Sequence, residues 1–195
     1  MANKEDRFQG VDYFNIDDLL TEEHVLIRDS ARQWVKQEVS PIIEKAYEDA
    51  KFPRQWIKGL GEIGAFGSYI PEQYGGPGLD QISYGLLMQE LERGDSGLRS
   101  TASVQSSLVM YPIWQYGSEE QKMKYLPKLG TGEMIGCFGL TEPDHGSNPG
   151  GMVSSFKDAG DHVILNGAKM WISNAPFADI AVVWAKDESG RIHGL

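Results

Sequence analysis

The spacing of apolar residues changes near Gly132, and this change divides the chain into two parts. Before it, Ile27, Ala31, Trp34 and Val35 recur at i, i+4, i+7 and i+8, which places them on one face of a helix. After it, short apolar runs such as residues 162–165 and 181–184 alternate with turn sequences, as strands do. We therefore predict an α+β chain, with an all-α helical domain over residues 1–132 followed by an antiparallel β-domain over residues 133–195.

Capping and breaking residues indicate where the helices begin and end. Asp80 is a suitable N-cap, Ser118 with Gln121 forms a capping-box pattern, and Pro112 is expected to kink the helix that contains it. Glycine and proline exclude regular structure over residues 70–78. The predicted helices span residues 21–39, 53–63, 80–94, 96–116 and 118–129.

Two turn sequences in the second part predict hairpins. Residues 158–161 (Asp-Ala-Gly-Asp) and 187–190 (Asp-Glu-Ser-Gly) carry the residues that tight turns require. They favour an antiparallel sheet. About four short strands would leave edges and one face of such a sheet uncovered, so we expect the chain to be truncated.

Composition and charge exclude several function classes. A composition with 41% apolar residues can fill a core, while the net charge of −10 disfavours nucleic acid as a partner. No apolar stretch approaches the roughly 20 residues of a membrane-spanning helix, and the first residues lack a signal pattern, so a cytoplasmic location is expected. Cys137 is the single cysteine and the four histidines lack metal-ligand spacing, so neither a disulfide nor a metal site is predicted.

Two stretches in the second part could carry chemistry. Residues 137–147 form a bend whose backbone N–H groups and hydroxyls, from Thr141 and Ser147, could meet a planar heterocycle or a phosphate; the alternative is a strand with an unusual turn. In residues 169–174, Trp171 could stack on a cofactor with Ser173 on the same face of a strand, or it could be a buried core residue. His145 could be a general base, but a role in the loop is favoured.

A third group lies where two predicted helices meet. Glu92, Arg93, Arg99 and Ser100 could meet a small charged ligand there, or could be solvated surface residues.

Taken together, these stretches resemble the acyl-CoA dehydrogenase family, and within it the glutaryl-CoA dehydrogenases. The motifs specific to the family are the turn at residues 138–147 (Phe-Gly-Leu-Thr-Glu-Pro-Asp-His-Gly-Ser) and residues 166–174 (Asn-Gly-Ala-Lys-Met-Trp-Ile-Ser-Asn). Residues 103–110 (Ser-Val-Gln-Ser-Ser-Leu-Val-Met), with Arg99 and Ser100, point to the glutaryl branch. Residues 70–76, 90–100 and 116–122 extend the resemblance over nearly the whole chain.

The resemblance implies an acyl-CoA dehydrogenase-like fold and FAD as cofactor. In such a fold FAD lies between the β-domain and a C-terminal helical bundle, which would lie beyond Leu195. Trp171 would pack on the isoalloxazine ring, Ser173 would address flavin N5, and Ser147 would also reach the CoA thioester. The implied cofactor-binding residues are Phe138, Leu140, Thr141, Gly146, Ser147, Trp171, Ile172 and Ser173.

The resemblance also implies the reaction and the partners. A glutamate beyond Leu195 would remove the α-proton, so no catalytic residue is expected here and the chain alone is expected to be inactive. Glu92, Arg99 and Ser100 would surround the distal carboxylate of glutaryl-CoA. The enoyl product could be decarboxylated to crotonyl-CoA, and electrons would pass to an electron-transferring flavoprotein. The complete protein would be a homo-oligomer, specifically a homotetramer.

Two positions depart from the family's pattern, and other functions stay open. Asn148 stands where aspartate is common, and Ser173 where threonine is common. The alternatives are another short-chain acyl-CoA dehydrogenase, an acyl-CoA oxidase, and a catalytically silent acyl-CoA or flavin-binding module.

Overall fold

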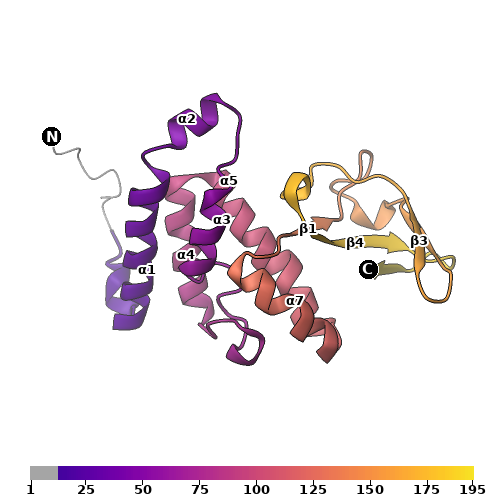
Figure 1. Cartoon of the computed structure of the whole chain (residues 1–195), viewed down its shortest axis with the longest axis horizontal. Helices are drawn as coiled ribbons and strands as arrows, with labels where there is room; N and C mark the ends of the chain where they lie inside the picture. Colours follow the sequence, from indigo (N-terminus) through magenta and orange to yellow (C-terminus); the bar gives the residue numbers. More distant parts are fainter. Residues whose placement is uncertain (1–12) are drawn as a thin grey trace.

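A computed structural model describes residues 13–195, and it consists of a helical part followed by a β-sheet part (Figure 1). This order confirms the predicted architecture. The helices are α1 (Glu22–Trp34), α2 (Ile43–Glu48), α3 (Gln55–Glu62), α4 (Gln81–Gly94), α5 (Ser96–Ser103), α6 (Tyr111–Tyr116) and α7 (Glu119–Thr131). The strands are β1 (Gly136–Gly139), β2 (Ser155–Asp158), β3 (Val163–Asn166), β4 (Ile180–Lys186) and β5 (Ile192–Gly194). None of the helices in residues 13–195 is long and apolar enough to cross a membrane.

The capping residues act as predicted. The Asp80 carboxylate accepts a hydrogen bond from the Ser83 N–H at 2.8 Å, and Ser118 and Gln121 form the reciprocal capping box. The predicted helix over residues 96–116 runs through α5, a π-helical stretch (Val104–Met110) and α6. Pro112 lies in the first turn of α6, where its missing N–H interrupts the regular α-helical bonding pattern.

The helical core contains a buried ion pair between α1 and α4. Arg32 donates to both carboxylate oxygens of Glu90, with Nε–Oε2 and Nη2–Oε1 distances of 3.0 and 2.9 Å. The Glu90 side chain is fully buried, whereas that of Arg32 is 27% exposed. The core around these helices is built from aromatic and aliphatic side chains that include Trp56, Leu60, Phe66, Leu91, Leu98 and Met110.

The sheet is mixed, so the expectation of a purely antiparallel β-domain is wrong in this detail. Both predicted hairpins are present, because β2 pairs antiparallel with β3 and β4 with β5. However, β4 pairs in parallel with β1 and with β2, which gives the order β1-β4-β2-β3. Parallel partners need a long crossover connection, and the chain supplies one over residues 140–179, between β1 and β4.

Two amides join the sheet to the helices. The buried Gln105 donates to the carbonyls of Leu129 and Met134 and accepts from the Gly136 N–H, all within 2.9 Å. The Asn174 amide donates to the carbonyls of Gly136 and Thr101 at 3.2 and 3.4 Å. Since these amides are buried and bonded on both sides, they hold β1 and the segment before β4 against the helical part.

Candidate functional site

The first predicted cofactor segment, residues 137–147, begins in β1 and leaves the sheet at the end of this strand. The Phe138 ring contacts Trp184 of β4 edge to face, with 6.0 Å between the ring centroids. Beyond it, Glu142 and His145 exchange two backbone hydrogen bonds and close a tight turn. Gly146 and Ser147 are exposed after this turn, while Leu140 and Thr141 are half-buried before it. The structure thus places His145 in a loop, as favoured from the sequence.

The second predicted cofactor segment, residues 169–174, is a loop. The prediction of a strand carrying Trp171 and Ser173 is therefore wrong. Trp171 and Asn174 have φ angles of 60° and 68°, in the left-handed region, and this breaks the alternation that a strand requires. The alternative of a buried Trp171 is also wrong, because this residue is 83% exposed. Ile172 is half-buried and Ser173 is exposed.

The structure brings these two segments side by side. The Met170 N–H donates to the Thr141 carbonyl at 2.9 Å, and the Lys169 ammonium donates to the Leu140 carbonyl at 3.0 Å. Residues that lie about 30 positions apart in the sequence are therefore adjacent. Trp171, which is exposed, follows Met170 directly in the sequence.

An ion pair that was not predicted from the sequence stabilises the contact between these two segments. The Lys169 ammonium lies 2.9 Å from the Glu142 carboxylate, which is 1% exposed and also accepts from the N–H groups of Val153 and Ser154. Burial raises the pKa of Glu142, but the bonds from Lys169, Ser154 and Val153 outweigh burial and hold the pKa at about 2. The only sequence signal was a pair of opposite charges, one in each family motif.

This low pKa predicts how the stabilising effect of Glu142 depends on pH. A carboxyl group whose pKa is lower in the folded than in the unfolded state stabilises the fold above the unfolded value of about 4.3. That stabilisation is lost as the pH falls toward 2. We expect Glu142→Gln to lower the free energy of unfolding by a constant amount from pH 7 to 5, and by less at lower pH. Urea unfolding of both proteins across this range is the measurement, and a difference independent of pH down to pH 3 would contradict the prediction.

The third predicted group contains an ion pair between Glu92 and Arg99, where α4 meets α5. The Arg99 Nε donates to Glu92 Oε2, and the Ser96 hydroxyl donates to Glu92 Oε1, both at 2.6 Å. Arg99 Nη1 also donates to the Ser103 hydroxyl at 3.3 Å. The bonds from Arg99 and Ser96 hold the pKa of the Glu92 carboxyl below its usual range. The Arg99 side chain is 37% exposed, so this guanidinium, a group suited to bonding carboxylates, is in part open to solvent.

Asn174 connects this group to the second cofactor segment. Its side-chain amide donates to the Thr101 carbonyl. Ser100 is the residue before Thr101, and Ser173 is the residue before Asn174. In residues 13–195 no hydrogen bond joins Gly146 or Ser147 to Arg99. The structure therefore brings together the 140–142 and 169–174 segments, and it places the second of these beside α5.

The aromatic ring and the hydroxyls that these two segments carry fit a planar heteroaromatic ligand such as FAD. The Trp171 indole offers a large uncovered ring surface. Within the described residues, the hydroxyls of Thr141, Ser147 and Ser173 make no hydrogen bond and are free to bind a ligand. No group of acidic, histidine or cysteine side chains in residues 13–195 is arranged to hold a metal ion.

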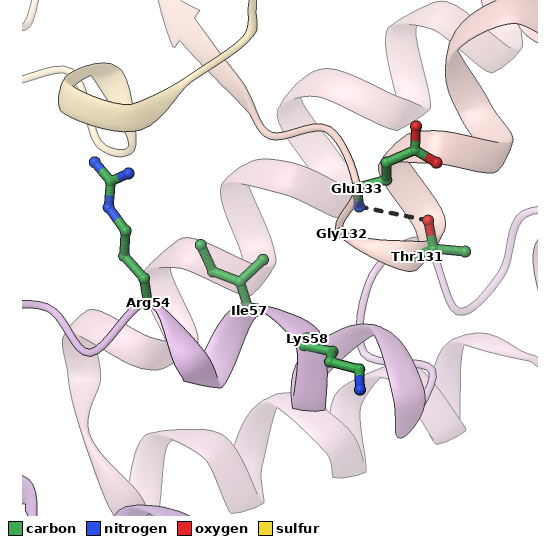
Figure 2. A pocket seen from close by; sticks show the side chains of 6 residues that line it. All are labelled: Arg54, Ile57, Lys58, Thr131, Gly132 and Glu133. Carbon is green, nitrogen blue, oxygen red and sulfur yellow. Dashed lines mark hydrogen bonds between the residues drawn. The ribbon is translucent and has the colours of Figure 1, made fainter.

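A cavity of about 380 Å³ lies elsewhere, between α3 and the end of α7 (Figure 2). Figure 2 shows the Glu133 N–H donating to the Thr131 hydroxyl at its rim, at 3.4 Å. None of its lining residues belongs to the predicted site. These residues are Arg54, Ile57, Lys58, Thr131, Gly132 and Glu133.

Comparisons with known proteins agree with this arrangement. The family described as "Acyl-CoA dehydrogenase, N-terminal domain" matches residues 21–133, and "Acyl-CoA dehydrogenase, middle domain" matches residues 137–195. A glutaryl-CoA dehydrogenase of Desulfococcus multivorans is 39% identical over 180 residues, which cover 90% of this chain and 46% of that protein.

Two solved structures have the same fold. A glutaryl-CoA dehydrogenase from Mycobacterium smegmatis in complex with FADH2 is 47% identical, with a TM-score of 0.89 over 93% of this chain and 46% of that chain. The butyryl-CoA dehydrogenase from Megasphaera elsdenii is 34% identical, with a TM-score of 0.80 over 86% of this chain and 45% of that chain. The chain thus spans about half the length of these relatives.

Proposed function

Because the chain belongs to the acyl-CoA dehydrogenase family, we propose that it supplies the helical and β-sheet parts of an FAD-dependent enzyme that dehydrogenates an acyl-CoA thioester, with glutaryl-CoA as substrate. The observation that carries this proposal is the Met170–Thr141 contact, which aligns the two predicted cofactor segments. We place the boundary between the helical and β-sheet parts at residue 132.

In this proposal the cofactor is FAD, which accepts the β-hydrogen of the substrate as hydride when it is bound. Trp171 packs on the ring system, and Thr141 and Ser173 donate hydrogen bonds to its polar edge. Phe138, Leu140 and Ile172 add apolar contacts, while Gly146 and Ser147 close the loop. The free hydroxyls and the uncovered indole support these roles.

The substrate assignment depends on the group at the α4–α5 junction. Arg99, oriented by Glu92 and assisted by Ser100, binds the distal carboxylate of glutaryl-CoA, and Ser147 also contacts the thioester. A guanidinium facing a carboxylate favours a dicarboxylic substrate over a plain acyl chain. No residue of this chain is proposed as the base that takes the α-proton.

The proposal extends to the partners and to the product. Electrons pass from the reduced cofactor to an electron-transferring flavoprotein, and decarboxylation of the enoyl product gives crotonyl-CoA. The functional protein is a homo-oligomer. These points derive from the family resemblance, and production of carbon dioxide from glutaryl-CoA would test the decarboxylation directly.

The first experiment is a titration of the purified protein with FAD, followed by flavin fluorescence and the visible absorption band. We expect saturable binding, because Trp171 is exposed and the backbone bond from Met170 to Thr141 joins the two segments that carry these residues. Absence of binding would contradict the proposal for this chain.

A second candidate is dehydrogenation of an unsubstituted short-chain acyl-CoA. The observation that favours it is the ion pair between Arg99 and Glu92, because a guanidinium that is already paired has less positive charge to offer a substrate. The affinities of the FAD-loaded protein for glutaryl-CoA and for butyryl-CoA separate the two. Tighter binding of butyryl-CoA would overturn the glutaryl assignment.

A further inference from the structure

The Glu142–Lys169 pair differs from the surface ion pairs of the β-sheet part by its burial. The side chains of Glu142 and Lys169 are 1% and 13% exposed. By contrast, Lys157 and Glu188 lie 3.7 Å apart with side chains that are 70% and 74% exposed. A buried pair restricts the groups around it much more strongly than a solvated one, because either charge alone would be costly to bury.

This pair holds three separate segments together. The Lys169 ammonium bridges the Leu140 carbonyl and the Glu142 carboxylate, and the same carboxylate accepts from the N–H groups of Val153 and Ser154. The Ser154 carbonyl in turn accepts from the Lys186 N–H at the end of β4. The sheet, the first cofactor segment and the second cofactor segment therefore meet at one carboxylate.

Trp171 needs such support. It is a bulky residue in the left-handed region, with a φ of 60°, and its exposed side chain gains little from packing. The backbone before it is held by the Lys169 pair and the Met170–Thr141 bond. The backbone after it is held by the buried Asn174 amide.

We propose that Glu142 and Lys169 are positioning residues that hold Thr141 and Trp171 in the geometry in which they bind the flavin. Neither residue contacts the cofactor in this proposal; they act through the loop between β1 and β2 and the loop that carries Trp171. The inference rests on the function proposed above for the identity of the ligand, but the positioning itself can be measured without any ligand.

The test compares Lys169→Met with the parent protein and with Lys157→Met, which removes a cation of the exposed pair in the same sheet. Amide hydrogen exchange is followed at Met170, whose N–H bonds to Thr141, and at Val183 of β4, whose N–H bonds to Leu195. We expect faster exchange at Met170 only in Lys169→Met, with unchanged exchange at Val183. Equal acceleration at both amides would show a merely structural role and would overturn the proposal. Unchanged exchange at Met170 would also overturn it.

FAD titration of the same variants measures the consequence for binding. We expect the affinity of Lys169→Met to fall about 10- to 100-fold, as for residues that orient the groups of a binding site. Lys169→Arg keeps the positive charge and should restore most of the affinity, while Lys157→Met should bind as the parent does. If Lys169→Met fails to fold, Glu142→Gln, which keeps an acceptor of the same shape, takes its place.

The outcomes separate this inference from the proposed function. If the parent protein does not bind FAD, the proposed function is contradicted, and so is the proposal that the ligand positioned by this pair is FAD. A parent that binds FAD, with Lys169→Met binding equally well, overturns the positioning role alone.

Discussion

Replacing Arg32 with methionine is expected to lower the free energy of unfolding by about 3–5 kcal/mol. The reason is that Glu90 is fully buried and receives two hydrogen bonds from the Arg32 guanidinium, at 2.9 and 3.0 Å. Methionine leaves a buried carboxylate without its main partner. Arg93 Nε lies 3.5 Å from the same carboxylate and compensates for only part of the loss.

Urea unfolding followed by tryptophan fluorescence measures this effect. The double variant Arg32→Met/Glu90→Leu removes both charges and should recover most of the lost stability, because a buried pair can be replaced by apolar residues at little cost. Lys45→Met is the control, because Lys45 and its partner Asp49 are exposed; we expect a change below about 1 kcal/mol. An Arg32→Met protein as stable as its parent would show that the buried pair does not stabilise the α1–α4 contact.

Replacing Arg99 with methionine is expected to weaken the binding of glutaryl-CoA by about 2–5 kcal/mol, which is the cost of leaving a desolvated carboxylate unpaired. This corresponds to a loss of roughly 30- to 5000-fold in affinity. Because the Arg99 side chain is 37% exposed, we expect a value near the lower end of this range. Butyryl-CoA lacks the distal carboxylate, so its affinity should change little.

The affinities of both thioesters for the FAD-loaded protein are the measurement. Lys128→Met, which removes an exposed cation at the end of α7, is the matched control. In Arg99→Met, the unpaired Glu92 carboxylate would repel the substrate carboxylate, so adding Glu92→Gln should restore part of the affinity. Equal affinities of parent and Arg99→Met for glutaryl-CoA would remove Arg99 from the substrate site.

Local sequence determined the helices and the hairpins, because their signals act within a few residues. Asp80 caps α4 through an N–H three residues away, and the turns at residues 158–161 and 187–190 join adjacent strands. The family motifs likewise pointed to the two segments that the structure places side by side. The residues that approach one another at the candidate site were therefore predictable as segments.

Only the tertiary structure decided how those segments are held. The parallel pairing of β1 with β4, the left-handed, exposed Trp171, and the ion pair from Glu142 to Lys169 all join or depend on residues far apart in the sequence. Spacing and propensity describe neighbours along the chain, whereas these features follow from hydrogen bonds and burial between distant segments. A buried carboxylate must find its partners wherever the fold brings them, and here those partners are Lys169 and the backbone of Val153 and Ser154.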